Sequence, residues 1–197
     1  MVGIVNKTDK TSKTIHCSGS LISDRFVLTA AHCVDDIENN ENFQLVFGAD
    51  DLSVEFPLSS YREDREIKQS LKHPKHDKAN GTHYYDVGIF EIDGKDLAFS
   101  DGITPICLPK KAVYDVDSRN GDGVTLTGFG KKSKVDSAKI EDVPLRFAQL
   151  EIYAQQRCNE SYASVTESIP DLFQSNIMCA SYQVSIDRAF TYLARYT

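Results

Sequence analysis

The sequence predicts an all-β protein whose short strands close into a barrel or pack as a sandwich. Runs of β-branched and aromatic residues are short, and Gly, Pro, Asp and Ser residues separate them. No long amphipathic helical pattern occurs before residue 180. Many short strands divided by frequent turn signals are typical of all-β barrels and sandwiches.

The strand signals can be placed along the chain. Residues 20–30 predict a tight hairpin that turns at Asp24. In residues 145–153 the apolar positions change phase between Phe147 and Leu150, so we expect a β-bulge there. The remaining expected strands are 43–47, 65–71, 87–92 and 124–129.

Length and charge limit the class of protein and its partners. The 197 residues suit one domain, large enough for two lobes and a substantial core. Lys and Arg number 22 and Asp and Glu number 29, so the net charge is −7. An acidic protein without a basic stripe repels nucleic acid and anionic membranes, and no stretch is long enough to span a bilayer. We therefore expect neither as a partner, and we expect the acidic stretch 35–38 to be solvated surface.

Cysteines and glycosylation motifs both favour an oxidising, extracellular compartment. The chain has five cysteines, and an odd number leaves one without a partner. The triplets that begin at Asn6, Asn80 and Asn159 are acceptor motifs for N-glycosylation. The first apolar stretch has only five residues, too short for the core of a signal peptide. We expect a secreted parent protein whose export signal this chain does not carry.

His32 and Asp86 are the candidate catalytic residues. A lone histidine beside an apolar strand is more often structural than catalytic. However, a disulfide from Cys17 to Cys33 would close a loop of about 15 residues, stabilise the fold by about 3 kcal/mol and fix the backbone beside His32, as a general base requires. Asp86 precedes a buried-looking strand, where an unpaired carboxylate is unfavourable and a histidine N–H would be a suitable partner.

Five segments, in order, resemble the trypsin- and chymotrypsin-like serine endopeptidases. HCSGSLISDRFVLTAAHCV resembles the family's histidine segment, and YYDVGIFEI resembles its aspartate segment. ITPICLP resembles the strip that joins the two barrels, and VTLTGFG resembles the Gly-aromatic-Gly turn, with Phe129 where Trp is usual. LRFAQLEIYAQQRCNESY followed by NIMCAS resembles the stretch around the disulfide loop of the second barrel.

The resemblance implies a two-barrel fold that is incomplete at both ends. Residues 1–180 would form a partial domain, with a nearly complete first barrel in 1–115 and part of the second in 116–180. Residues 181–197 would be a tail of unclear structure.

The resemblance also implies roles for individual residues. His32 would be the general base and acid, and Asp86 would orient its imidazole and stabilise the imidazolium. Disulfides would join Cys17 to Cys33 and Cys158 to Cys179, and Cys107 would be unpaired.

The family's nucleophile lies in a Gly-Asp-Ser-Gly-Gly motif, which does not occur in this chain. Ser181 and Ser185 lack the flanking glycines that form the turn and the oxyanion donors. The start of the chain resembles the middle of the family's first strand and not its Ile-Val-Gly-Gly start. We expect a fragment or a misassembled gene model of a longer secreted protease, with a truncated pseudo-protease as the alternative.

Three functions follow from these observations. The first is a serine endopeptidase by descent, acting on protein or peptide substrates and open to protease inhibitors, but inactive as given. The second is a non-catalytic protease homologue that acts as a binding module. The third is a chain without function, whose exposed sheet edges and apolar faces cause aggregation.

No cofactor or metal is expected. GVTLTGFGKKS is similar to a phosphate loop, but Phe129 stands where the motif requires lysine. His73, His76, Asp77 and His83 suggest a zinc site, but no cysteine joins them and His73-Pro74 matches a common loop of the family.

Overall fold

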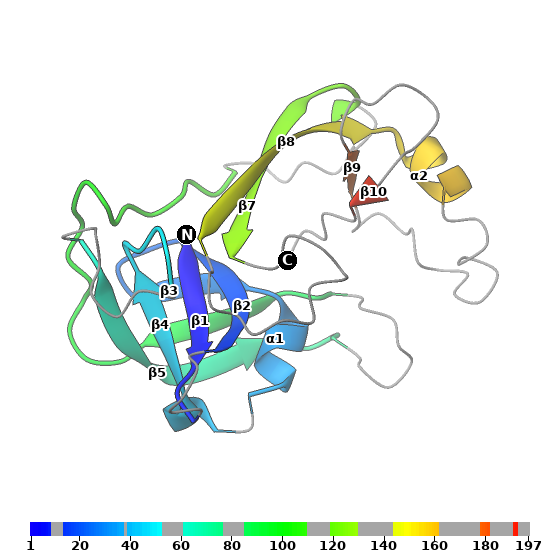
Figure 1. Ribbon diagram of the computed structural model, residues 1–197. Coiled ribbons are helices and arrows are strands. Elements are labelled where there is room, and N and C mark those ends of the chain that lie inside the picture. The colour runs from blue at the N-terminus through cyan, green and yellow to red at the C-terminus, as the bar shows by residue number, and fades with distance from the viewer. Residues whose placement is uncertain are drawn as a thin grey trace.

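The structure is a computed structural model in which six strands close into a barrel and four further strands form a second sheet beside it (Figure 1). The expected all-β class is confirmed, and the first sheet is a barrel and not half of a sandwich. The structure describes residues 1–8, 14–37, 39–52, 61–76, 85–109, 119–129, 144–161, 178–181 and 191–192.

The barrel is antiparallel throughout, and its strand order is β1-β2-β3-β6-β5-β4. The expected hairpin is present, with Ser20 opposite Leu28 and a hydrogen bond of 2.9 Å from the Ile22 N–H to the Phe26 carbonyl. Closure leaves no free edge among these strands. Their bounds are β1 Val2–Asn6, β2 Thr14–Leu21, β3 Phe26–Thr29, β4 Phe43–Phe47, β5 Glu63–Lys72 and β6 Gly88–Ile92.

Alternation along the strands fills the barrel with apolar side chains. In β6 the side chains of Phe90 and Ile92 are buried, and those of Ile89 and Glu91, which alternate with them, are half-buried. Val2 and Ile4 of β1 are fully buried in the same core as Leu45 of β4. Strands β1 and β4 are buried on both faces instead, because Val5 and Val46 pack in a second apolar cluster outside the barrel core.

The second sheet has the order β10-β9-β8-β7, and β8 pairs residue for residue with β7 from Leu145 to Glu151. The bulge expected in this strand is therefore wrong. The phase change has another cause: Leu150 and Ile152 are buried on one face, whereas Phe147 is 73% exposed on the other. The bounds are β7 Gly123–Phe129, β8 Leu145–Tyr153, β9 Cys179–Ser181 and β10 Thr191–Tyr192.

The helices are short. They are α1 Ala31–Asp35, the 3-10 turn η1 Asn40–Asn42 and α2 Gln155–Ser161. None of the helices in the described residues has the length and apolar character needed to span a membrane.

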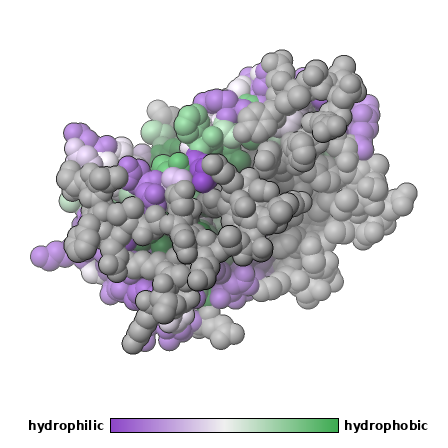
Figure 2. Space-filling view, viewed as in Figure 1, coloured by the Kyte–Doolittle hydropathy of each residue, from purple (hydrophilic) through white to green (hydrophobic). Residues whose placement is uncertain are grey.

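Phe129, at the end of β7, connects the second sheet to the barrel. Its side chain is packed with Val5, Val46 and Leu52 in a second apolar cluster on the barrel. Its backbone N–H donates to the Ser18 hydroxyl at 3.0 Å, and that hydroxyl lies 3.4 Å from the Phe129 carbonyl oxygen. Figure 2 shows a hydrophobic patch over the part of β7 and β8 that lies near the barrel.

Candidate active site

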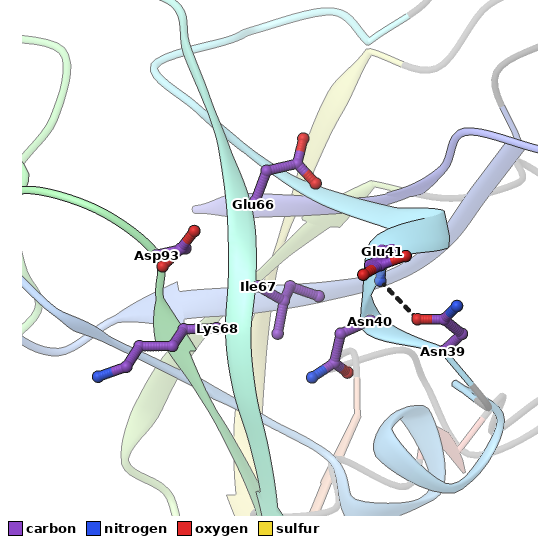
Figure 3. A pocket seen from close by; sticks show the side chains of 7 residues that line it. All are labelled: Asn39, Asn40, Glu41, Glu66, Ile67, Lys68 and Asp93. Carbon is purple, nitrogen blue, oxygen red and sulfur yellow. Dashed lines mark hydrogen bonds between the residues drawn. The ribbon is translucent and has the colours of Figure 1, made fainter.

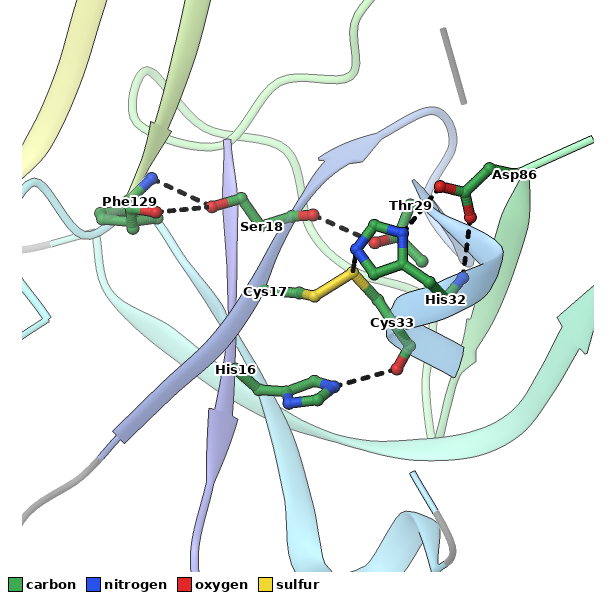
Figure 4. The surroundings of a disulfide bond; sticks show 8 residues. All are labelled: His16, Cys17, Ser18, Thr29, His32, Cys33, Asp86 and Phe129. Atoms are coloured by element: carbon green, nitrogen blue, oxygen red, sulfur yellow. Dashed lines mark hydrogen bonds and ion pairs between the residues drawn. A yellow bond between two sulfur atoms is a disulfide. The ribbon is translucent and has the colours of Figure 1, made fainter. Parts of the chain in front are cut away.

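His32 lies on α1, the short helix that follows β3 directly. Nothing in the helix itself holds it firmly, because it has five residues and its N-cap residue, Ala30, offers no side-chain cap. A disulfide joins Cys33 to Cys17 on β2, with the Cα atoms 6.2 Å apart (Figure 4). The expected disulfide is thus present, and it fixes the helix beside the histidine.

Asp86 meets His32 at two points (Figure 4). Its Oδ1 accepts the backbone N–H of His32 at 2.8 Å, and its Oδ2 lies 2.7 Å from Nδ1 of the imidazole. An ionised carboxylate only accepts hydrogen bonds, so Nδ1 carries the proton and Nε2 keeps its lone pair. The side chain of Asp86 is 2% exposed and that of His32 is 41% exposed, so the pair has one buried and one accessible member.

The backbone before Asp86 is unusual. Tyr85 has a φ of +50°, which lies in the left-handed region that non-glycine residues seldom adopt. Its ring stacks on His73 with centroids 4.7 Å apart, and Lys75 lies 5.3 Å from the same centroid. These contacts hold the turn that directs the Asp86 carboxylate toward α1.

Close packing between α1 and β6 completes the arrangement. A Cβ atom at Gly88 would lie 2.7 Å from the side chain of Val34 and 3.0 Å from the carbonyl oxygen of Ala30. Any other residue there would push the helix away from the strand that follows Asp86.

The sequence model of the trypsin family matches residues 1–189. The chain belongs to the trypsin family. The beta subunit of clotting factor G from Tachypleus tridentatus is 28% identical over 169 residues, which are 84% of this chain and 51% of the relative. Serine protease Hayan from Drosophila melanogaster is 33% identical over 152 residues, which are 77% of this chain and 22% of the relative. The chain thus spans about half the length of the first relative and less of the second.

Solved structures show the same fold. Neuropsin, a serine protease expressed in the limbic system of mouse brain, superposes with a TM-score of 0.71 at 19% identity, and the match covers 98% of this chain and 77% of neuropsin. The expected trypsin-like architecture is therefore confirmed.

The other cysteines of this trypsin-family chain are arranged as expected. Cys158 on α2 and Cys179 on β9 form the second disulfide, with Cα atoms 5.9 Å apart. Cys107 is free and exposed.

Three of the residues singled out as potential modification or nucleophile sites lie among the described residues. The side-chain oxygen of Asn6 accepts hydrogen bonds from the N–H and the hydroxyl of Thr8 in the same triplet, at 2.8 and 2.7 Å. Asn159 falls within α2. Ser181 is 3% exposed in β9. Asn80 and Ser185 lie outside the described residues.

Among the described residues, ligand atoms of Cys17, His32 and Cys33 lie within 4.8 Å of one another. The two sulfur atoms are joined in the disulfide, so they are not the thiolates that a metal requires. His73 and His76 have different partners, since His73 stacks on Tyr85 and His76 bonds to Asp35. Asp77 and His83 lie outside the described residues.

Sequence analysis missed the pairing of Asp35 with His76. The acidic stretch 35–38 was expected to be solvated, which is wrong for Asp35, because its side chain is only 9% exposed. Lys72 and His76 bind its two oxygens. No local pattern joins residues 41 positions apart, so only the fold reveals this cluster.

A groove of about 540 Å³ lies between η1 and β5, apart from the candidate catalytic pair (Figure 3). Its three acidic side chains do not converge on one point in Figure 3. Two of the charged side chains are already paired, Glu66 with Lys7 and Lys68 with Glu91. The lining residues are Asn39, Asn40, Glu41, Glu66, Ile67, Lys68 and Asp93.

Proposed function

We propose that this chain carries the histidine–aspartate half of a serine endopeptidase active site. His32 acts as the general base and acid, and Asp86 orients the imidazole and stabilises the imidazolium. The observation that carries the proposal is the two-point contact of the Asp86 carboxylate with the backbone and the ring of His32.

The chemistry follows from the proton on Nδ1. Nε2 accepts the proton of an attacking hydroxyl as that oxygen bonds to the carbonyl carbon of a peptide, and the imidazolium later gives the proton to the leaving amine. The buried carboxylate stabilises the positive ring between these steps without taking the proton itself. Membership of the trypsin family supports proteins or peptides as the substrates and protease inhibitors as further partners.

The proposal assigns no nucleophile within the 197 residues. The Gly-Asp-Ser-Gly-Gly motif is absent from the sequence, and Ser181 is buried in a strand. A base without a nucleophile in reach has nothing to activate. We expect the chain as given to form no acyl-enzyme.

An activated ester tests this expectation directly. The chain is mixed with a p-nitrophenyl ester, and nitrophenolate release is followed in the first seconds. We expect no burst equal in amount to the protein, and a stoichiometric burst would contradict the proposal. The roles of His32 and Asp86 are tested in the full-length transcript product, where His32→Ala and Asp86→Asn should each lower kcat much more than they change KM.

A second candidate is a non-catalytic family member that acts as a binding module. The burial of Ser181 favours it, because this serine, two residues after Cys179, is not accessible as a nucleophile. The full-length transcript separates the two candidates. A Gly-Asp-Ser-Gly-Gly motif downstream favours the protease, and a stable transcript that ends at Thr197 and yields a soluble folded product favours the binding module.

We also propose that the parent protein is secreted and glycosylated, with the lobes divided at residues 1–115 and 116–180. Two disulfides and the Asn6 triplet support an oxidising compartment. Expression in a secretory host should give a product whose mass falls on treatment with a peptide N-glycosidase, and Asn6→Gln should remove one glycan from it.

A further inference from the structure

A second histidine–aspartate pair lies at the other end of the helix that carries His32. Nε2 of His76 is 3.0 Å from Oδ2 of Asp35, the last residue of α1. The side chain of His76 is 1% exposed and that of Asp35 is 9% exposed. Lys72 at the end of β5 binds the other oxygen of Asp35.

His76 and Asp86 belong to the same hairpin. Strands β5 and β6 are antiparallel, Lys72 pairs with Gly88, and the His73 N–H donates to the Val87 carbonyl at 2.9 Å. His76 therefore lies on the side of the connection that leaves β5, and Asp86 lies on the side that enters β6.

Both sides of this connection are bound to the same short helix. His76 holds α1 through Asp35, and Asp86 holds it through His32, one turn earlier along the helix. A five-residue helix without a side-chain N-cap does not fix its own orientation. Its position relative to Asp86 comes from the Cys17–Cys33 disulfide, from the packing of Val34 beside Gly88 of β6, and from these two histidine–aspartate contacts.

We propose that His76 is a positioning residue for the candidate catalytic pair. With Asp35 and Lys72 it fixes the C-terminal end of α1 against the β5–β6 hairpin, and this keeps the His32 imidazole in register with the Asp86 carboxylate. This inference rests on the proposed function for its importance. The contact between His32 and Asp86 that it explains is present in the structure whatever reaction the longer protein performs.

The exchange rate of the proton on Nδ1 of His32 reports on the hydrogen bond between this ring and the Asp86 carboxylate. In the chain as it exists, in dilute solution, its exchange with solvent is measured by 15N-edited NMR, and the backbone amide of Val27 in the barrel is the internal reference. His76→Leu fills the buried site without a donor, and His76→Gln retains a side-chain N–H at the same distance along the side chain. Val46→Ala is the matched control, because it weakens the fold at a residue that is 1% exposed and belongs to the apolar cluster around Phe129, which contains no residue of α1.

We expect His76→Leu to speed exchange of the His32 proton by about tenfold or more relative to the Val27 amide, the size expected when a hydrogen bond to a charged group is lost. In His76→Gln, the ratio of the His32 exchange rate to the Val27 exchange rate should stay close to that of the parent chain. In Val46→Ala, both exchange rates should rise by the same factor. If His76→Leu speeds both protons equally, or if His76→Gln behaves like His76→Leu, the proposal is overturned. Should His76→Leu not fold, Asp35→Asn replaces it with the same expected result and the same criterion.

Because the readout is the contact between His32 and Asp86 and not catalysis, it separates this inference from the proposed function. If the ratio of the His32 and Val27 exchange rates is the same in His76→Leu as in the parent chain, the positioning role is refuted, even if the longer protein is an active protease. A burst with the activated ester refutes the expected inactivity and leaves the positioning role standing.

Discussion

Both carboxylate oxygens of Asp86 are bound to a single residue, His32, one to its backbone N–H at 2.8 Å and the other to Nδ1 at 2.7 Å. The backbone contact fixes the position of α1, and the ring contact fixes the rotation of the imidazole. The same buried group therefore supports the fold and sets the tautomer of the histidine.

Asp86→Asn should disturb both contacts. The amide has one acceptor oxygen, and its NH₂ group would face an N–H donor, so we expect the free energy of unfolding to fall by about 1–3 kcal/mol. Urea unfolding measures this loss, and the 15N shifts of the His32 ring report the change of tautomer. Asp96→Asn is the control, because Asp96 is in an exposed pair with Arg25 and should leave stability nearly unchanged.

The Cys17–Cys33 disulfide should contribute through the unfolded chain. It closes a loop across a sequence separation of 16 residues. Replacing both cysteines by serine should lower stability by about 3 kcal/mol in the chain-entropy model. Denaturant unfolding under non-reducing conditions measures the loss. Cys107→Ser is the matched control, since Cys107 is free and exposed, and an equal loss in the control would refute this account.

The barrel and the His32–Asp86 contact could be predicted from sequence because each leaves a local sign. Residues 43–47 form a short apolar run, and the strand found there has the bounds that were expected. Asp86 is predicted to have a partner for another reason, because an unpaired carboxylate directly before a buried strand is unfavourable. The resemblance to the protease family then joined the two sites across 54 residues.

The features that sequence reasoning missed depend on long-range geometry. Asp35 looked like part of a solvated acidic loop, since nothing in the neighbouring residues shows that His76 and Lys72 cover it. The phase change at Phe147 predicts a bulge that the structure does not have, because periodicity alone does not tell an extra residue from an apolar side chain on the open face of a regular strand. Both errors concern what lies opposite a residue in space.

Ser18→Ala should weaken the connection between the barrel and the second sheet. The hydroxyl accepts the Phe129 N–H at 3.0 Å, and its loss removes that acceptor at a part-buried site. We expect destabilisation of about 1–3 kcal/mol and faster hydrogen exchange at the Phe129 amide than in the parent chain. Ser20→Ala, on the same strand, is the control. The account fails if the two variants show the same exchange at Phe129.

The acid stability of the chain should depend on Lys72. Its hydrogen bond, which is the largest influence, holds the pKa of Asp35 below the usual value, although burial acts in the opposite direction. A lowered pKa in the folded state gives stability that is present above the unfolded value and is lost as pH falls through the folded value. Lys72→Gln should therefore be less stable than the parent chain at neutral pH. The difference should begin to shrink as pH falls below about 4 and should vanish only below the lowered pKa of folded Asp35.

Unfolding by urea across that pH range measures the difference between the parent chain and Lys72→Gln. Arg25→Gln is the control, because it breaks an exposed pair that does not involve Asp35. A difference that stays constant down to the most acidic pH would show that Lys72 does not act through the ionised form of Asp35.

Self-association should depend on Phe147, the most exposed large apolar side chain among the described residues at 73%. It lies opposite Thr127 on β7, so Phe147→Thr gives a cross-strand Thr–Thr pair that suits the strand. We expect the parent chain to associate in sedimentation velocity as its concentration rises and Phe147→Thr to associate less, with stability changed by about 0.5 kcal/mol or less. Leu150→Thr, on the buried face of the same strand, should instead destabilise the fold without relieving association. A parent chain that stays monomeric and melts in one sharp transition would mean that this apolar face does not drive association.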